Sequence, residues 1–299
     1  MFGVPSSGFR VPAAARRQDQ SRARHAWHGT AKIIAPNMPR FKLLIEYAGT
    51  RYSGWQIQKN ARTVQGEIDR AVREVSRRRE FELYGSGRTD AGVHALAQVA
   101  HLELYTDLPP ESLRRKINDE LPADIHIRAI EKAPHRFHAR HDALARCYLY
   151  QISRRRTAFG KPYVWWIRES LDVGTMRAAA ASFVGMKNFE AFTADDPDEK
   201  STRVLVDSVD IVESGALLLV RIQGSHFLWK MVRRMVGVLA ACGRGELSAR
   251  DAAAFLEDSG KDSAAPAALA APAAGLFLEA VLYKGDPAPG PVRAVIGID

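Results

Sequence analysis

The order of hydrophobic and polar residues predicts alternating strands and helices along most of the chain. Residues 41–47 are apolar and rich in strand-forming side chains, and turn residues follow them. Beyond Thr63, which can cap a helix, apolar residues recur at i, i+4, i+7 and i+8, which is a helical period. The other elements expected in this first half are strands at 81–84 and 93–104, a helix opened by Pro110, and a strand at 125–130.

The resulting order, βαββαβ, recurs in the second half of the chain. A strand at 144–153 precedes a helix capped by Asp172, and 204–213 pairs with 216–223 as a hairpin around a Ser-Gly turn. This order is that of a ferredoxin-like unit, in which two helices cover one face of an antiparallel sheet. We therefore predict an α+β fold of two tandem ferredoxin-like halves with a mainly antiparallel sheet. The pattern leaves open whether the halves share one composite sheet or form two adjacent sheets, with a ligand cleft between them. The repeat is completed by helices near 227–241 and 249–256 and a last strand at 276–283.

The composition of the chain changes at both ends. Residues 1–38 lack hydrophobic periodicity and are rich in Arg, Ala, Ser and Gln, so they indicate a basic disordered extension, a transit peptide or an over-long reading frame. We favour the last, because Met38 is followed at once by the start of a strand. The rest divides into an N-terminal half (39–135), a C-terminal half (136–285) and a loose tail rich in Pro and Gly (286–299), with a surface loop expected at 263–275.

Net charge is a weak argument about ligands here. The chain has 43 basic and 34 acidic residues and a formal charge of +9, but its first 38 residues hold six basic residues against one acidic. Cys147 and Cys242 stand far apart in no metal-binding spacing, which argues against a disulfide framework or a zinc site. Apolar runs end short of the roughly 18 residues that a membrane span needs, and no signal peptide opens the chain. We expect a cytoplasmic globular protein without a metal or a membrane span.

The most unusual segment is residues 85–95, in which three glycines in eight positions surround Arg88 and Asp90 between two expected strands. Glycine allows conformations closed to other residues and lets a substrate approach the backbone closely. The segment lacks the Lys-Ser/Thr of a P-loop, and its third glycine comes too late for a dinucleotide fingerprint. Asp90 therefore either holds the backbone of an ordinary turn, or acts as a nucleophile or base with Arg88 as a neighbouring cation.

Residues 87–95, Gly-Arg-Thr-Asp-Ala-Gly-Val-His-Ala, resemble the catalytic motif of the TruA-type tRNA pseudouridine synthases, which modify uridines 38 to 40 of the anticodon arm. The resemblance extends over roughly 40–283. It implies a pseudouridine synthase fold with a basic cleft, tRNA as the substrate and partner, a homodimer, and no cofactor. Further matching segments, in the family's order, are 52–56, 63–66, 137–140, 145–150, 231–233 and 271–278.

The resemblance also implies roles for four residues. Asp90 matches the nucleophilic aspartate, and Tyr148 matches the tyrosine that packs on the target base. Arg233 matches the arginine that pairs with the aspartate and holds the space vacated by the base, and Arg88 would contact the RNA backbone. From the residues alone, Tyr148 could equally be a core aromatic side chain, and Arg233 could belong to the solvated face of an amphipathic helix.

Two departures from the family pattern concern RNA contacts. Cys147 stands where a basic residue is common, and Ser201-Thr202-Arg203 has the usual composition in an altered order. His94, beside the motif, is more typical of a structural histidine, and we assign it no catalytic role. Three basic runs, at 77–79, 114–116 and 154–156, either follow RNA phosphates or are solvated surface.

Isomerising uridine to pseudouridine breaks the N1–C1′ bond, turns the uracil and forms a C5–C1′ bond without a change in composition. One carboxylate therefore suffices, and no redox or metal cofactor is required. A base within a stem must be flipped out and stacked on an aromatic ring, and its C5 proton must leave to a weak base, where the resemblance places Tyr148. Whether Asp90 attacks the sugar, attacks the base or removes the 2′ proton stays open.

Two classes compete with this interpretation. A non-catalytic RNA-binding protein could keep the same scaffold for shape recognition, although simple binding would not require a carboxylate facing an anionic ligand. A ferredoxin-like metabolic enzyme or small-ligand sensor would show a compact pocket and no salt-dependent affinity for tRNA.

Overall fold

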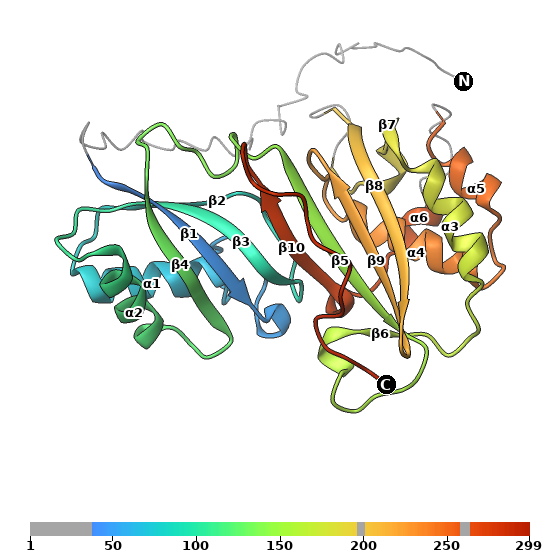
Figure 1. The fold of residues 1–299 in the computed structure, drawn as a ribbon, viewed down its shortest axis with the longest axis horizontal. Coiled ribbons are helices and arrows are strands. Elements are labelled where there is room, and N and C mark those ends of the chain that lie inside the picture. The colour runs from blue at the N-terminus through green and yellow to red at the C-terminus, as the bar shows by residue number, and fades with distance from the viewer. Residues whose placement is uncertain (1–37, 196–200, 258–263) are drawn as a thin grey trace, which may run out of the picture. The chain divides into compact units, whose positions relative to one another are not determined.

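The computed structural model describes residues 38–195, 201–257 and 264–299. The extension expected at 1–38 lies outside these residues apart from Met38. The described strands form one 10-stranded sheet in the order β4-β1-β3-β10-β5-β9-β8-β7, with β2 beside β3 and β6 beside β5 (Figure 1). The strands are β1 (Arg40–Tyr47), β2 (Glu82–Gly85), β3 (His94–Glu103), β4 (Ile125–Ala133), β5 (Ala145–Ser153), β6 (Trp165–Trp166), β7 (Gly185–Asn188), β8 (Arg203–Ser214), β9 (Leu217–Gly224) and β10 (Leu276–Leu282). The helices are α1 (Val64–Ser76), α2 (Pro110–Glu120), α3 (Val173–Ser182), α4 (Met231–Gly243), α5 (Ala249–Ala254) and α6 (Ala264–Ala268).

The duplicated βαββαβ order is confirmed. The first half runs β1-α1-β2-β3-α2-β4, and the second runs β5-α3-β8-β9-α4-β10 with short additions. The two halves share a single sheet because β10 lies between them. It pairs in parallel with β3, Phe277 opposite His94, and in antiparallel with β5, Leu278 opposite Tyr148. One composite sheet, rather than two adjacent sheets, is therefore the correct choice between the two arrangements.

The helices of both halves cover the same face of this sheet. In the first half, the apolar face of α1 packs with alternate residues of β1, such as Leu43 and Ile45, in one buried cluster. In the second half, α3 and α4 pack on alternate residues of β5 and β9 in another cluster. On β10, Leu276 belongs to the second cluster and Leu278 to the first, and residues two apart on a strand face the same side. The halves therefore meet beneath β10 with their cores side by side.

The C-terminal segment covers the opposite face of β5 and β9. A third buried cluster joins Leu149 and Leu219 to Ile298, and the Val295 N–H donates to the Gln151 side chain (2.7 Å). The buried guanidinium of Arg221 ties the segment down as well, because Nη1 donates to the Gly290 carbonyl (2.6 Å). This packing differs from the loose tail expected at 286–299. The few hydrophobic residues near the end of the chain outweigh its Pro and Gly content, because their burial stabilises the segment.

Two further differences concern the second half. Helix α6 lies within 263–275, where composition predicted only a loop. Helix α4 begins at Met231 rather than near 227, because Lys230 takes a left-handed conformation (φ 63°) that ends the preceding irregular segment. No helix in the described part of the chain is both long and apolar enough to span a bilayer.

Candidate active site

The loop that carries Asp90 runs along the edge of β3. It connects β2 to β3, and its first residues bond to β3 itself: the Ser86 N–H donates to the Val99 carbonyl (2.7 Å), and the Gln98 side chain donates to the Gly87 carbonyl (3.1 Å). The Ser86 hydroxyl in turn donates to Gln98 Oε1 (2.7 Å). These bonds hold the loop where β2 has ended, on the side of β3 that β10 and β5 extend.

A second segment, around Gly54, supports the backbone on either side of Asp90. The Trp55 N–H donates to the Thr89 carbonyl (3.1 Å), and the Gly92 N–H donates to the Tyr52 carbonyl (3.2 Å). Gly54 has φ +92°, and a Cβ at this position would lie 2.6 Å from the Thr89 carbonyl oxygen. Only glycine fits both the conformation and this close approach. The position of Asp90 is therefore determined by backbone contacts from two directions.

The Asp90 carboxylate faces Arg233. Arg233 Nη1 lies 3.5 Å from Asp90 Oδ2, with 19% of the arginine side chain and 25% of the aspartate side chain exposed. Arg233 lies in the first turn of α4, and its Nε donates to the Ala271 carbonyl (2.7 Å) while its own carbonyl accepts from the Ala271 N–H (2.9 Å). The carboxylate is thus reachable from solvent and has a charged partner that is itself held in place.

Tyr148 lies on β5 at the boundary between the two cores and packs partly against both. Its ring meets the Phe227 ring edge-on, with 5.3 Å between the ring centres and an interplanar angle of 89°. Loss of hydration, followed by the negative charge of Asp90, raises the pKa of Tyr148 to about 12. Tyr148 is therefore a neutral phenol near the carboxylate, with a half-buried ring.

The other residues singled out from the sequence lie apart from this group. Arg88 is exposed, two residues before Asp90, and no ion pair joins it to a carboxylate among the described residues. His94 is buried, accepts from the Gly49 N–H (3.0 Å) through Nδ1, and places Nε2 3.0 Å from the Pro162 carbonyl, which is a structural arrangement. The Cys147 thiol is buried next to Glu279 and belongs to the face of β5 opposite Tyr148.

The three basic runs are partly neutralised by neighbouring carboxylates. Such exposed pairs contribute little stability, but they reduce the charge that the runs offer to RNA. This favours solvated surface for much of each run. The pairs are Arg77 with Glu74 (2.6 Å), Arg114 with Glu111 (2.6 Å) and Arg154 with Glu213 (2.7 Å).

One residue beside the site received no role in the sequence analysis, although it lies in the matching segment 145–150. The half-buried Arg146, on β5, donates from Nη2 to the Ser86 carbonyl at the start of the Asp90 loop (3.1 Å). No group of three or more His, Cys, Asp or Glu side chains suited to a metal lies in the part of the chain that the structure describes.

Comparisons with known proteins identify relatives of the chain. The family model described as tRNA pseudouridine synthase matches residues 43–142 and 179–284. A tRNA pseudouridine synthase A from Geobacter sp. (strain M21) is 40% identical over 248 residues, which is 82% of this chain and 99% of the relative. One from Rhodopseudomonas palustris (strain BisA53) is 39% identical over 83% of this chain and all of the relative. Among solved structures, one match is to a chain in the crystal structure of the archaeal box H/ACA sRNP Nop10-Cbf5 complex. The match includes 68% of this chain and 42% of that chain, with a TM-score of 0.32 and 9% sequence identity.

The fold and the site describe a class of enzyme. Its duplicated α+β scaffold holds one solvent-accessible carboxylate, which has an arginine partner and lies near a tyrosine ring. The family match and the relatives go further. The chain belongs to the tRNA pseudouridine synthase family, as a TruA-type isomerase that converts uridine to pseudouridine in tRNA.

Replacing Gly54 by alanine should destabilise the protein and reduce activity, because the Cβ would meet the Thr89 carbonyl and displace the Asp90 loop. We expect a loss of about 3 kcal/mol in the free energy of unfolding, measured by urea denaturation. Gly285→Ala is the matched control, since Gly285 has φ +93° but nothing within 4 Å of its added Cβ. It should cost about 1 kcal/mol and leave conversion unchanged. Equal losses in the two variants would contradict a role for close backbone approach at Gly54.

Proposed function

We propose that the chain isomerises uridines 38, 39 and 40 in the anticodon stem-loop of tRNA, with Asp90 as the nucleophile. The observation that carries the proposal is the Asp90–Arg233 ion pair beside the Tyr148 ring. The pair contains a carboxylate that solvent reaches and a cation that can leave it for RNA. A negative charge at this point would repel RNA and weaken simple binding. A catalytic role therefore explains the carboxylate better than a role in RNA affinity.

In this proposal the target uridine leaves the RNA stack and its uracil packs on the ring of Tyr148. The ring is supported edge-on by Phe227 and carries no charge, which suits stacking on a neutral base. Arg233 pairs with Asp90 in the free enzyme and fills the gap in the RNA stack once the base has left, and Arg88 contacts the RNA backbone. The N1–C1′ bond breaks, the uracil turns, the C5–C1′ bond forms, and the proton on C5 departs.

Asp90→Asn should bind tRNA as well as the parent protein but should convert no uridine, because the amide cannot act as the nucleophile. Release of tritium from tRNA labelled at C5 measures conversion, and filter binding measures affinity. Arg233→Ala should weaken both, since it removes the partner of Asp90 and the group that fills the gap. Asp119→Asn, on the exposed surface of α2, is the matched control and should change neither. Tritium release by Asp90→Asn at a rate near that of the parent would show the assignment to be wrong.

Tyr148→Phe should separate stacking from proton transfer. The ring is kept, so tRNA affinity should stay within about twofold, because base stacking on an aromatic ring tolerates the loss of a hydroxyl. Single-turnover conversion should fall by about 100-fold, since the hydroxyl is the group nearest the uracil that can relay the C5 proton. Conversion by Tyr148→Phe at the parent rate would restrict Tyr148 to stacking.

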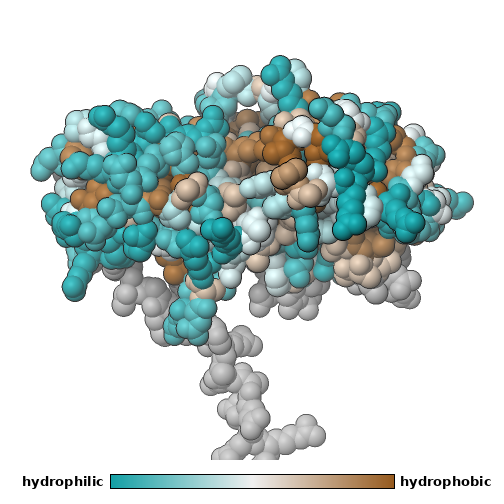
Figure 2. Space-filling view, turned by 90° about the horizontal axis from the view of Figure 1, so that it is seen from below, coloured by the Kyte–Doolittle hydropathy of each residue, from teal (hydrophilic) through white to brown (hydrophobic). Residues whose placement is uncertain are grey.

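We also propose a homodimer that works in the cytoplasm. The larger hydrophobic patches of the face seen in Figure 2 lie over the middle and the C-terminal half, whereas the N-terminal half of that face is mostly hydrophilic. In the C-terminal half, Phe159 is 96% exposed and Trp166 41% exposed, and large exposed apolar side chains are typical of association surfaces. Two free, buried cysteines fit a reducing compartment, which cell fractionation would test.

Mass photometry of the purified protein should therefore show a main species at twice the mass of the chain. The measurement should be repeated at high salt, because an interface held by apolar contacts should persist when charges are screened. A single species at the mass of one chain in both buffers would contradict the homodimer and leave the proposed chemistry of Asp90 untouched.

A further inference from the structure

Arg146 joins three segments of the chain at the edge of the active site. Its guanidinium donates to four main-chain carbonyls and thereby links the Asp90 loop, the connection from β4 to β5, and the end of β9. Few side chains other than arginine could reach so many acceptors at once. The acceptors are Ala143 (3.2 Å) and Ser225 (2.9 Å) for Nη1, and Ser86 (3.1 Å) and Arg140 (2.9 Å) for Nη2.

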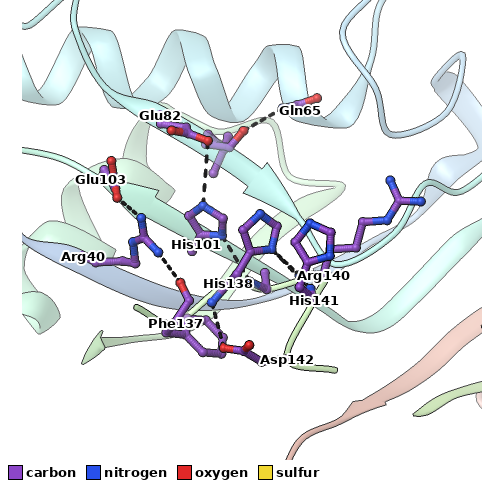
Figure 3. A network of polar contacts seen from close by, with 12 residues as sticks. Arg40, Gln65, Glu82, His101, Glu103, Phe137, His138, Arg140, His141 and Asp142 are labelled. Carbon is purple, nitrogen blue, oxygen red and sulfur yellow. Dashed lines mark hydrogen bonds and ion pairs between the residues drawn. The ribbon is translucent and has the colours of Figure 1, made fainter. Parts of the chain in front are cut away.

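The turn at 138–142, which contains Arg140, is held by several hydrogen bonds of its own. His138 Nδ1 accepts from the N–H groups of Arg140 (3.1 Å) and His141 (3.2 Å), and Asp142 accepts from the His138 N–H (2.9 Å). The His138 ring also packs against His101, with 4.8 Å between the ring centres. Figure 3 shows the side chain of Arg140 extending away from this network. It is exposed, and no carboxylate forms an ion pair with it among the described residues.

His226 brings a second basic side chain to the same point. It is exposed and follows Ser225, whose carbonyl is bonded to Arg146. Partial loss of hydration, followed by the positive charges of Arg146 and Arg140, lowers the pKa of His226. Arg146 binds the carbonyls of both Ser225 and Arg140, so it brings together the two segments that carry His226 and Arg140. His226 Nδ1 lies 3.0 Å from the Ser225 hydroxyl, which leaves Nε2 as the nitrogen that can face a ligand.

We propose that Arg140 and His226 form a binding site for one phosphate of the RNA backbone, assembled by Arg146 at the start of the Asp90 loop. A guanidinium can hold a phosphate through two parallel hydrogen bonds, and an imidazole can add a third donor. The hydrogen bonds within the turn at 138–142 fix its backbone, so binding has to order little more than the Arg140 side chain. The inference rests on the proposed function in one respect, namely that the RNA strand bound here continues to the uridine at Asp90.

The site is tested by Arg140→Gln, which removes the charge from an exposed side chain without disturbing the carbonyl that Arg146 binds. The dissociation constant for tRNA should rise about tenfold, and the slope of its logarithm against the logarithm of salt concentration should fall by about 1. Single-turnover conversion at saturating tRNA should change far less than affinity. Arg140→Lys should restore the slope, because the charge returns, but only part of the affinity, because a bidentate contact is lost.

Arg293→Gln is the matched control. Arg293 is exposed in the C-terminal segment, on the opposite face of the sheet, and loses the same charge. Its affinity and salt slope should equal those of the parent. His226→Gln should weaken binding less than Arg140→Gln, and the double variant should lose less than the two separate effects combined, because both contact one phosphate.

Equal salt slopes for Arg140→Gln and the parent would overturn the site. So would equal effects of Arg140→Gln and Arg293→Gln, because a general field of the protein would then explain the loss. Failure of the proposed function is distinguishable: it would appear as tritium release by Asp90→Asn, whatever the salt slope of Arg140→Gln.

Discussion

The pairing of β10 with β3 on one side and β5 on the other is the interaction on which the candidate active site depends. Asp90 lies on the loop that enters β3, and Tyr148 lies on β5. Arg233 belongs to α4 and bonds to Ala271, in the segment that leads into β10. All three side chains therefore lie on elements next to β10. They would not be brought together if the two halves formed separate sheets.

Local pattern predicted most of the elements because strand and helix periods are properties of neighbouring residues. It could not predict that β10 joins the halves, because the period of a strand says nothing about which edges it will pair with. The start of α4 was placed too early for a related reason. Phe227 and Leu228 continue the apolar pattern, whereas the left-handed conformation of Lys230 is set by its surroundings.

The candidate site was predicted in a different way. The roles of Asp90, Tyr148 and Arg233 came from resemblance to a family, and from residue patterns alone each had an ordinary structural explanation. The structure adds the ion pair, the neutral phenol and the contacts of Gly54. Arg146 lies in the matching segment 145–150, but its contacts could not be predicted from the sequence, since its partners are main-chain carbonyls, which every residue possesses.

The Arg233 side chain makes one hydrogen bond and one ion pair, and the hydrogen bond fixes the inner end of its guanidinium. Its Nε is bonded to the Ala271 carbonyl, while only its terminal nitrogen faces Asp90. In the proposed mechanism, the exchange of Asp90 for a segment of RNA requires only a rotation of the guanidinium about this anchored end, and α4 can stay in place. A protein built in this way can expose the Asp90 carboxylate without moving its scaffold.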